Sequence, residues 1–128
     1  MLDTSVVIDL DRVRADQLPD EPAITALTLA ELAAGPHATE DPAERARRIS
    51  IVQLVEAVFD PIPFDAEAAR AYGRIVGAVI GTGRVARGRR AVDLMIAATA
   101  MAVRLPLYTR NAVDFVGLGS LLEVVALA

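Results

Sequence analysis

Four acidic residues stand among apolar neighbours, where carboxylates are rare unless they are paired or bind a metal. They are Asp3, Glu31, Asp93 and Asp114. Ionised carboxylates about 4 Å apart repel by roughly 4 kcal/mol per pair at an effective dielectric constant near 20, so a cluster of them needs protons or a cation. Because the chain offers oxygen ligands, we expect Mg²⁺ or Mn²⁺, with Ca²⁺ as an alternative and zinc disfavoured.

A divalent cation held by these carboxylates would support hydrolysis. A metal-bound water with a lowered pKa is a nucleophile, and further carboxylates can orient or deprotonate it. The cation would also neutralise charge on a phosphodiester transition state. Ser5 and Asn111 are supporting candidates that could bind a metal-bound water or a phosphate oxygen, although each could equally cap a helical turn.

Each of the four carboxylates also has a structural interpretation. Asp3 lies beside a helix start, and Glu31 could complete a capping box with Thr28. Asp93 could interact with the dipole at the start of a helix, and Asp114 lies in a short turn. The functional interpretation therefore depends on the four residues converging in space.

Composition excludes several other chemistries. The chain has 128 residues, which fits one domain spanning 1–128, and 54% of them are hydrophobic, enough for a core. It has no cysteine, no lysine and one histidine, which excludes thiol and lysine chemistry and cysteine- or histidine-rich metal sites. No apolar run approaches the roughly 20 residues of a membrane helix, and no signal peptide is visible. We therefore expect a cytoplasmic protein without a membrane span.

Arginines supply all the positive charge of a chain whose net charge is −4. Four of them precede Asp93 within seven residues and could bind a nucleic-acid backbone, joined by Arg110; a solvated loop is the equal alternative. The four are Arg84, Arg87, Arg89 and Arg90. Other acidic residues are interpreted as surface or capping residues, namely Asp9, Asp11, Asp41 and Asp65.

Short apolar segments alternate with helical patterns along the chain. Strands are expected at 1–3, 23–26, 61–64, 105–109 and 122–127. Helices are expected at 4–10, from 28 to about 35, and at 43–58, 66–80 and 92–104, with a helical turn at 111–115. Capping residues predict several helix starts, which are Thr4 or Ser5, Thr28, Asp41 and Asp65.

This alternation predicts an α/β fold, with a small parallel sheet of four or five strands and helices on both faces. The crossovers should be right-handed. In such sheets, ligands bind outside the carboxyl ends of the strands. Three of the four carboxylates follow a predicted strand or open the helix after one, and Asp93 starts a buried helix. All four can therefore point toward one rim of the sheet.

Several segments together resemble the PIN-domain ribonucleases, most closely the VapC toxins of bacterial toxin–antitoxin pairs. They are Leu2-Asp3-Thr4-Ser5, Thr28-x-x-Glu31-Leu32, Ala91-Val92-Asp93-x-x-Ile96-Ala97-Ala98 and Leu107-x-Thr109-Arg110-Asn111-x-x-Asp114-Phe115. The segment Ile62-Pro63-Phe64-Asp65, followed by Ala68-Ala69-x-x-Tyr72-Gly73, fits the same family. The resemblance spans nearly the whole chain in the family's order, and the third and fourth motifs are the specific ones.

The resemblance implies a single PIN-like domain with an Mg²⁺- or Mn²⁺-dependent endoribonuclease activity. It implies a toxin that blocks translation by cutting structured RNA, commonly tRNA or rRNA. It also implies a homodimer and a VapB-like antitoxin that covers the site. The family's acidic quartet falls on the four carboxylates singled out above, and all four are present.

Two other functions are considered. The segment 6–11 imitates the strand and Asp-x-Asp signature of haloacid-dehalogenase-like phosphatases, but Arg12-Val13 follows where that family has Gly-Thr, and its lysine is absent. The position of Asp9 on a helix or at a strand end discriminates between these families. The second alternative is a catalytically silent regulatory module that keeps the PIN fold and its partner without cutting RNA.

Overall fold

The computed structural model describes residues 1–84 and 87–128, and it confirms the α/β class. Its helices are α1 (Thr4–Ile8), α2 (Ala26–Ala34), α3 (Pro42–Val58), α4 (Ala66–Gly81) and α5 (Arg89–Ala102). Its strands are β1 (Leu107–Thr109) and β2 (Val124–Ala126), which pair in parallel. Short 3₁₀ turns, η1 to η4, lie at Leu10–Arg12, Ala15–Gln17, Gly35–Ala38 and Ala112–Phe115.

The sheet is smaller than expected, because only two of the five predicted strands are regular in the described residues. The other three extended segments are joined by isolated bridges and single backbone hydrogen bonds rather than by continuous ladders. Leu2 forms a parallel bridge with Tyr108, and Thr25 forms one with Ile62. The Leu2 N–H donates to the Ala23 carbonyl at 2.8 Å, which links the two pairs. The five segments thus lie side by side as predicted, although three of them are too short to form continuous ladders.

The order of these segments places a reversal at the N-terminal segment. Across the sheet the order is 61–63, 23–25, 1–3, β1 and β2. The chain therefore moves outward in one direction from 1–3 and then returns to its other side at β1. In open α/β sheets, ligands bind at such a reversal, outside the carboxyl ends of the strands.

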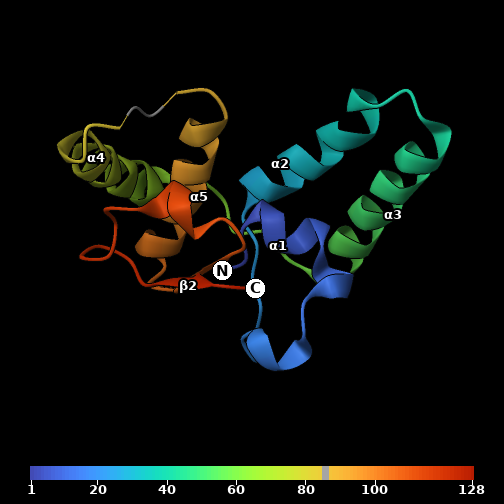
Figure 1. The fold of residues 1–128 in the computed structure, drawn as a ribbon, viewed down its shortest axis with the longest axis horizontal. Helices are drawn as coiled ribbons and strands as arrows, with labels where there is room; N and C mark the ends of the chain where they lie inside the picture. The colour runs from blue at the N-terminus through green and yellow to red at the C-terminus, as the bar shows by residue number, and fades with distance from the viewer. Residues whose placement is uncertain (85–86) are drawn as a thin grey trace.

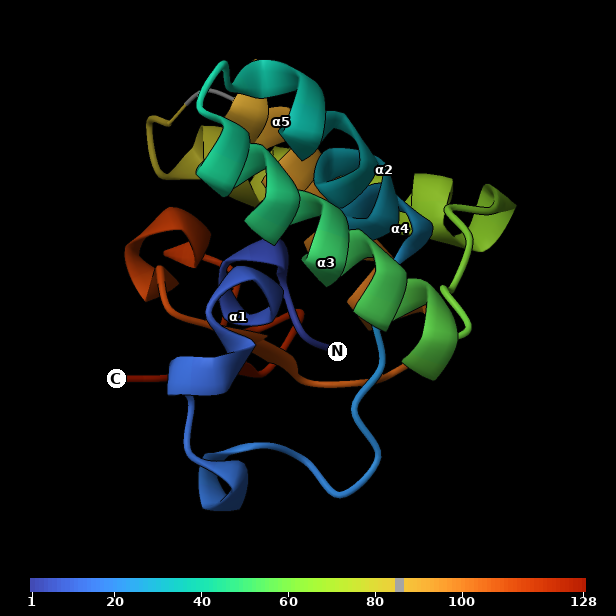
Figure 2. The same ribbon diagram turned by 90° about the vertical axis from the view of Figure 1, so that its right-hand side faces the viewer.

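Helices cover both faces of the sheet, as predicted. Successive residues of a strand point to opposite faces. Leu107 belongs to one buried cluster with Ile75 of α4 and residues of α5, whereas Leu2 belongs to a second cluster with Val6 of α1 and Val55 of α3. Figure 1 shows α4 and α5 on one side of the molecule and α2 and α3 on the other, with α1 between them. In Figure 2, α2 and α3 run side by side above α1.

Capping side chains explain where most of the helices begin. The Asp41 and Asp65 carboxylates accept the N–H groups of Ala43 and Ala68, so these two predicted caps are confirmed. The predicted cap of α1 at Thr4 or Ser5 is wrong, because the carboxylate one position earlier, Asp3, accepts the Val6 N–H.

The predicted capping box at Thr28 and Glu31 is also wrong. The Thr25 hydroxyl accepts the Thr28 N–H at 3.0 Å, which starts α2 at Ala26. Thr28 therefore lies inside the helix, and Glu31 is too far along it to return to a cap. The purely local explanation for Glu31 is thereby removed.

No helix among the described residues is long and apolar enough to cross a membrane. The helix predicted at 92–104 is observed at Arg89–Ala102, and every residue of the run 96–100 is buried. This helix packs against α4 and supplies much of the core on that face of the sheet.

Removing a buried side chain from α4 should destabilise the fold. Ile75 is fully buried against α5 and β1, so Ile75→Ala should lower the free energy of unfolding by about 2–5 kcal/mol. The matched control is Ile80→Ala in the same helix, where the side chain is 63% exposed and the change should be within about 0.5 kcal/mol. Urea titration of both variants checks this, and equal losses would contradict the assigned packing of α4.

Candidate active site

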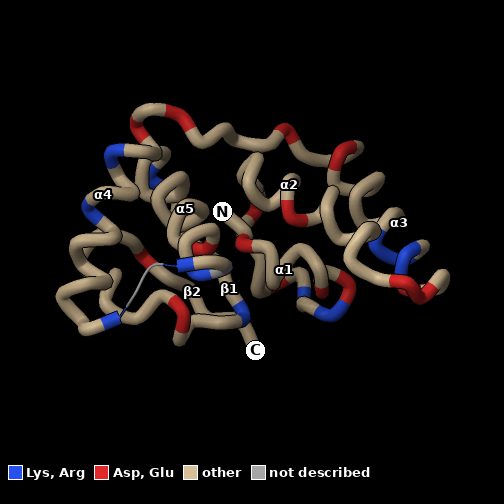
Figure 3. The backbone as a smooth tube through the Cα atoms, turned by 90° about the horizontal axis from the view of Figure 1, so that it is seen from above, with Lys and Arg blue, Asp and Glu red and all other residues tan. Residues whose placement is uncertain are grey.

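A pocket of about 480 Å³ opens at the reversal of the sheet. Three of the four predicted carboxylates line it, namely Asp3, Asp93 and Asp114, together with both supporting candidates, Ser5 and Asn111. They come from the turn after the N-terminal segment, the first turns of α5, and the chain after β1. Figure 3 shows acidic positions at the start of α1 and beside α5, near the centre of the molecule. The prediction that remote carboxylates meet at one rim is therefore confirmed for these three.

Asp3 is the most enclosed of these carboxylates, with 5% of its surface exposed. Its Oδ1 accepts the Ser5 hydroxyl at 2.5 Å and the Val6 N–H at 3.2 Å. Burial raises the pKa of the Asp3 carboxyl above its ordinary value, while hydrogen bonds from Ser5, Thr109 and Val6 oppose that rise. The protein thus holds this carboxylate firmly in a place where its negative charge is unfavourable without a nearby cation.

Glu31 does not line this pocket. It lines a neighbouring pocket of about 410 Å³, and Thr4 lines both. The Thr4 hydroxyl donates to Glu31 Oε1 at 2.6 Å and lies 3.1 Å from the Thr28 hydroxyl. Because the single proton of Thr4 is given to Glu31, Thr28 is the donor to Thr4. Glu31 is therefore connected to the site through one hydroxyl group.

Asp114 lies in η4, where Arg90 holds it in place. The Arg90 Nη1 donates to the Asp114 carbonyl at 3.2 Å, and its Nη2 lies 3.6 Å from the Asp114 carboxylate. Across residues 1–84 and 87–128, no group of three or more acidic, histidine or cysteine side chains is arranged to hold a metal ion by itself. The acidic residues therefore share a pocket without forming a complete set of direct ligands.

The donor set of the pocket nevertheless fits a hard divalent cation. Its carboxylate, amide and hydroxyl groups are all oxygen donors, which Mg²⁺ and Mn²⁺ prefer. Mg²⁺ usually keeps several waters and needs only one or two protein carboxylates. The buried charge of Asp3 supplies a further reason for a cation at this place.

The arginines predicted to bind RNA have different surroundings in the structure. Arg84 donates to the Val113 carbonyl at 2.8 Å, and Arg90 contacts Asp114, so both fasten η4 rather than extend freely. Arg87 is exposed, and the side chain of Arg89 lies outside the described part of the structure. Arg110 lines the pocket itself.

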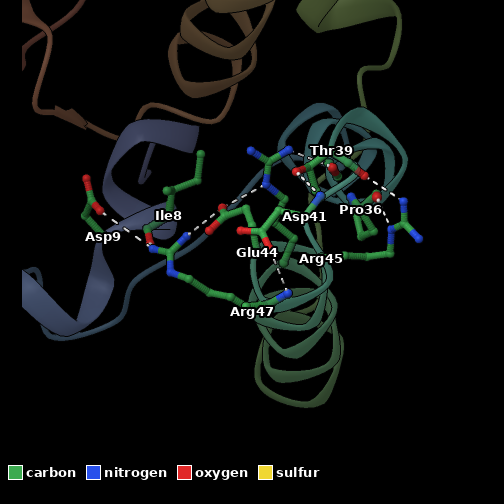
Figure 4. Close-up of polar contacts among 11 residues, drawn as sticks. Ile8, Asp9, Pro36, Thr39, Asp41, Glu44, Arg45 and Arg47 are labelled. Carbon is green, nitrogen blue, oxygen red and sulfur yellow. Dashed lines mark hydrogen bonds and ion pairs between the residues drawn. The ribbon is translucent and has the colours of Figure 1, made fainter.

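Asp9 was interpreted as a surface or capping residue, but it lines the pocket. Its Oδ2 accepts from Arg110 Nη1 at 2.7 Å, and its Oδ1 lies 3.9 Å from Arg47 Nη2. Figure 4 shows Arg47 reaching from α3 toward Ile8 and Asp9. The signal in the sequence was the spacing of Asp9 four residues after Ser5, which places both on one face of a helix.

The position of Asp9 also answers the question of the haloacid-dehalogenase-like alternative. Asp9 directly follows helix α1, and Asp11 lies in the η1 turn, so neither acid stands at the end of a strand. The apolar residues before Asp9 are helical. The segment therefore matches the strand and Asp-x-Asp signature in residue types but not in secondary structure. That alternative is wrong.

Comparisons with known proteins agree with this geometry. The PIN domain family matches residues 1–115. "Ribonuclease VapC" of Rickettsia bellii (strain RML369-C) is 31% identical over 119 residues, covering 90% of this chain and 87% of that protein. "Ribonuclease VapC5" of Mycobacterium tuberculosis (strain ATCC 25618 / H37Rv) is 37% identical over 114 residues, covering 87% and 82%.

A solved structure extends the likeness to three dimensions. A chain in the crystal structure of VapBC-5, a member of the VapBC family of toxin–antitoxin systems from Mycobacterium tuberculosis, superposes with a TM-score of 0.84. It is 35% identical, and the match covers 98% of this chain and 95% of that chain. The likeness in sequence and in fold extends over nearly the whole chain, which therefore belongs to the PIN-domain family, among its VapC ribonucleases.

Proposed function

We propose that this chain is an Mg²⁺- or Mn²⁺-dependent endoribonuclease and the toxin of a toxin–antitoxin pair. Its substrate would be tRNA or rRNA, and cutting either would block translation. The observation that carries the proposal is the meeting of Asp3, Asp93 and Asp114 in one pocket at the reversal of the sheet. The relatives named as ribonucleases support the type of reaction.

In this proposal, Asp3, Asp93 and Asp114 hold the cation, and Glu31 acts beside them through Thr4 or a water. When bound, the cation supplies a water of lowered pKa and neutralises charge on the phosphodiester. The Ser5 hydroxyl and the Val6 N–H keep the Asp3 carboxylate directed into the pocket. Arg90 holds Asp114, and the Asn111 side chain is available to a phosphate oxygen or to water.

The same acidic pocket suits inhibition by a protein partner. We propose a VapB-like antitoxin that covers the site, with a basic side chain among the carboxylates. The support is the likeness to a chain of the VapBC-5 structure, which is a member of the VapBC family of toxin–antitoxin systems. A homodimer of this chain belongs to the same proposal. Co-expression of the chain with its partner should relieve growth inhibition in a host in which the chain alone is toxic.

Neutralising one pocket carboxylate should abolish RNA cleavage. Asp93→Asn keeps the size of the side chain but removes its charge, so cleavage of tRNA and rRNA in Mg²⁺ should fall at least about a hundredfold. Removal of metal with EDTA should have the same effect on the unaltered protein, and added Mg²⁺ or Mn²⁺ should restore cleavage.

The matched control is Asp16→Asn, because Asp16 is an exposed acid paired with Arg14 outside the pocket. It should cleave at the unaltered rate. An Asp93→Asn variant that cuts RNA as fast as this control would rule out the proposed site. An unaltered protein that binds its partner but cuts no RNA would favour the regulatory module instead.

Replacing Asp3 by Asn should abolish RNA cleavage without lowering the stability of the metal-free protein. The folded protein raises the pKa of Asp3, so its protonated form is favoured on folding; this contribution to stability is present at low pH and is lost as pH rises through the folded pKa. In EDTA at pH 7, Asp3→Asn should therefore be at least as stable as the unaltered protein, because Asn also caps helices well. Its advantage should shrink as the pH falls through the raised pKa of Asp3 in the folded protein, and the loss should be complete near the ordinary carboxyl pKa of 3.8.

The comparison variant is Asp3→Ala, which loses the α1 cap as well and should be about 1 kcal/mol less stable than Asp3→Asn. Both variants should lose RNA cleavage. Thermal unfolding at acidic and neutral pH measures these differences. If Asp3→Asn is destabilised at pH 7, the hydrogen bonds to the charged carboxylate outweigh its burial, and the assigned balance is incorrect.

A further inference from the structure

One side of the acidic pocket is basic. Arg110 and Arg12 line it together with Asp9. The Arg110 side chain is 29% exposed, and its Nη1 donates to Asp9 Oδ2 at 2.7 Å. A pocket with carboxylates on one side and guanidinium groups on the other can hold both a cation and an anion.

Arg110 is also tied to Asp3 through Ser5. The backbone N–H of Arg110 donates to the Ser5 hydroxyl at 3.2 Å, and that hydroxyl donates to Asp3 Oδ1 at 2.5 Å. Two hydrogen bonds thus fix the residue that carries the guanidinium relative to the most buried carboxylate of the site. The basic side therefore has a defined position with respect to the acidic side.

The guanidinium of Arg110 keeps the capacity to bind an anion. In the described part of the chain, the Asp9 carboxylate is the only group that accepts a hydrogen bond from it. A guanidinium carries five N–H donors in a planar fork that matches phosphate oxygens in pairs. Donors of Arg110 therefore remain for a ligand at the pocket.

Two guanidinium groups meet at the Asp9 carboxylate. Asp9 is shared between Arg110 at 2.7 Å and Arg47 at 3.9 Å, so one carboxylate faces two guanidinium groups. Arg47 is held by its own hydrogen bond to the Ile8 carbonyl at 3.2 Å and by Glu44 at 3.5 Å (Figure 4). The exposed Arg12 adds a further positive charge on this side of the pocket. Within the pocket lining, two guanidinium groups, Arg12 and Arg110, thus accompany the single carboxylate of Asp9, which favours an anionic ligand beside Arg110.

We propose that Arg110 binds a non-scissile phosphate of the RNA, next to the phosphate that lies at the carboxylates, and that Asp9 is the residue that positions Arg110 for it. The inference rests on the proposed function and adds a second phosphate subsite to it. Asp9 holds the fork of Arg110 while no RNA is bound. The structural alternative is an ion pair that only ties the end of α1 to the end of β1.

Binding of RNA without cleavage tests the subsite. In an Asp93→Asn background, the affinity for a short fluorescein-labelled single-stranded RNA of mixed sequence is measured by anisotropy at fixed Mg²⁺ over a series of KCl concentrations. Adding Arg110→Met should weaken binding roughly tenfold, as expected for a hydrogen bond to a charged group. It should also lower the slope of log affinity against log salt by about 0.7, the value for one phosphate contact on a single strand.

The matched control is Arg70→Met in the same background. Arg70 is an exposed arginine of α4 that pairs with Glu67, outside the pocket. It should leave both the affinity and the salt slope unchanged. An Arg110→Met variant that binds like this control would overturn the subsite, even if its thermal stability is reduced, because the ion pair would then serve the fold alone.

A double-mutant cycle tests the positioning by Asp9. If Asp9 positions Arg110, Asp9→Ala should weaken RNA binding, and the effect of Arg110→Met should become much smaller in the Asp9→Ala protein. Asp9→Asn, which keeps an oxygen acceptor, should recover most of the affinity. Tighter binding on removal of Asp9 would show that Asp9 only repels RNA, and additive effects would likewise overturn the positioning role.

These outcomes are separate from those that test the nuclease. Cleavage by the unaltered protein decides the proposed function, whereas the affinities above are measured in a variant that does not cleave. If Arg110→Met binds RNA with an unchanged salt slope while the unaltered protein cleaves RNA, only the proposed subsite is ruled out. If RNA binds through Arg110 but the unaltered protein does not cleave it, the nuclease proposal is ruled out and the anion site is supported.

Discussion

The burial of one negative charge at the reversal of the sheet governs the rest of this structure. Asp3 follows the central extended segment, caps α1 and lies almost fully inside the protein. Its hydrogen bonds from Ser5 and Val6 hold the carboxylate where it lies, although burial makes its ionised form unfavourable. A helix cap needs only a polar oxygen, so a buried charge at this position is consistent with the cation site proposed above.

The sequence predicted those parts of the fold that depend on neighbours along the chain. The caps Asp41 and Asp65 were recognisable because each bonds an N–H within three residues. The start of α2 was not, because Thr25 and Thr28 are equally suitable caps by residue type. What separates them is tertiary: the Thr28 hydroxyl contacts Thr4, 24 positions away. The number of regular strands was likewise overestimated, since pairing between remote segments decides whether an extended segment forms a ladder.

In the candidate site too, the features set by local sequence were predictable, and those set by contacts between remote segments were not. Apolar neighbours marked the carboxylates, and the expected edge of the sheet brought three of them into one pocket. The position of Glu31 behind Thr4, and the fastening of η4 by Arg84 and Arg90, depend on contacts that no local pattern contains. The Asp9–Arg110 pair joins residues 101 positions apart. The spacing of Asp9 from Ser5 indicates a shared helix face, but no local pattern indicates that Arg110 pairs with Asp9.

A net charge of −4 disfavours RNA binding, but its effect is weak at the distances that matter. At physiological ionic strength, charges more than about 8 Å apart are largely screened. Figure 3 shows acidic positions spread over the molecule, and only four of the 17 acidic residues line the pocket. A phosphate at the pocket therefore interacts chiefly with the groups that line it. The acidic side needs a cation to accept that phosphate, whereas the basic side at Arg110 does not, and a nucleic-acid strand can be oriented by this difference.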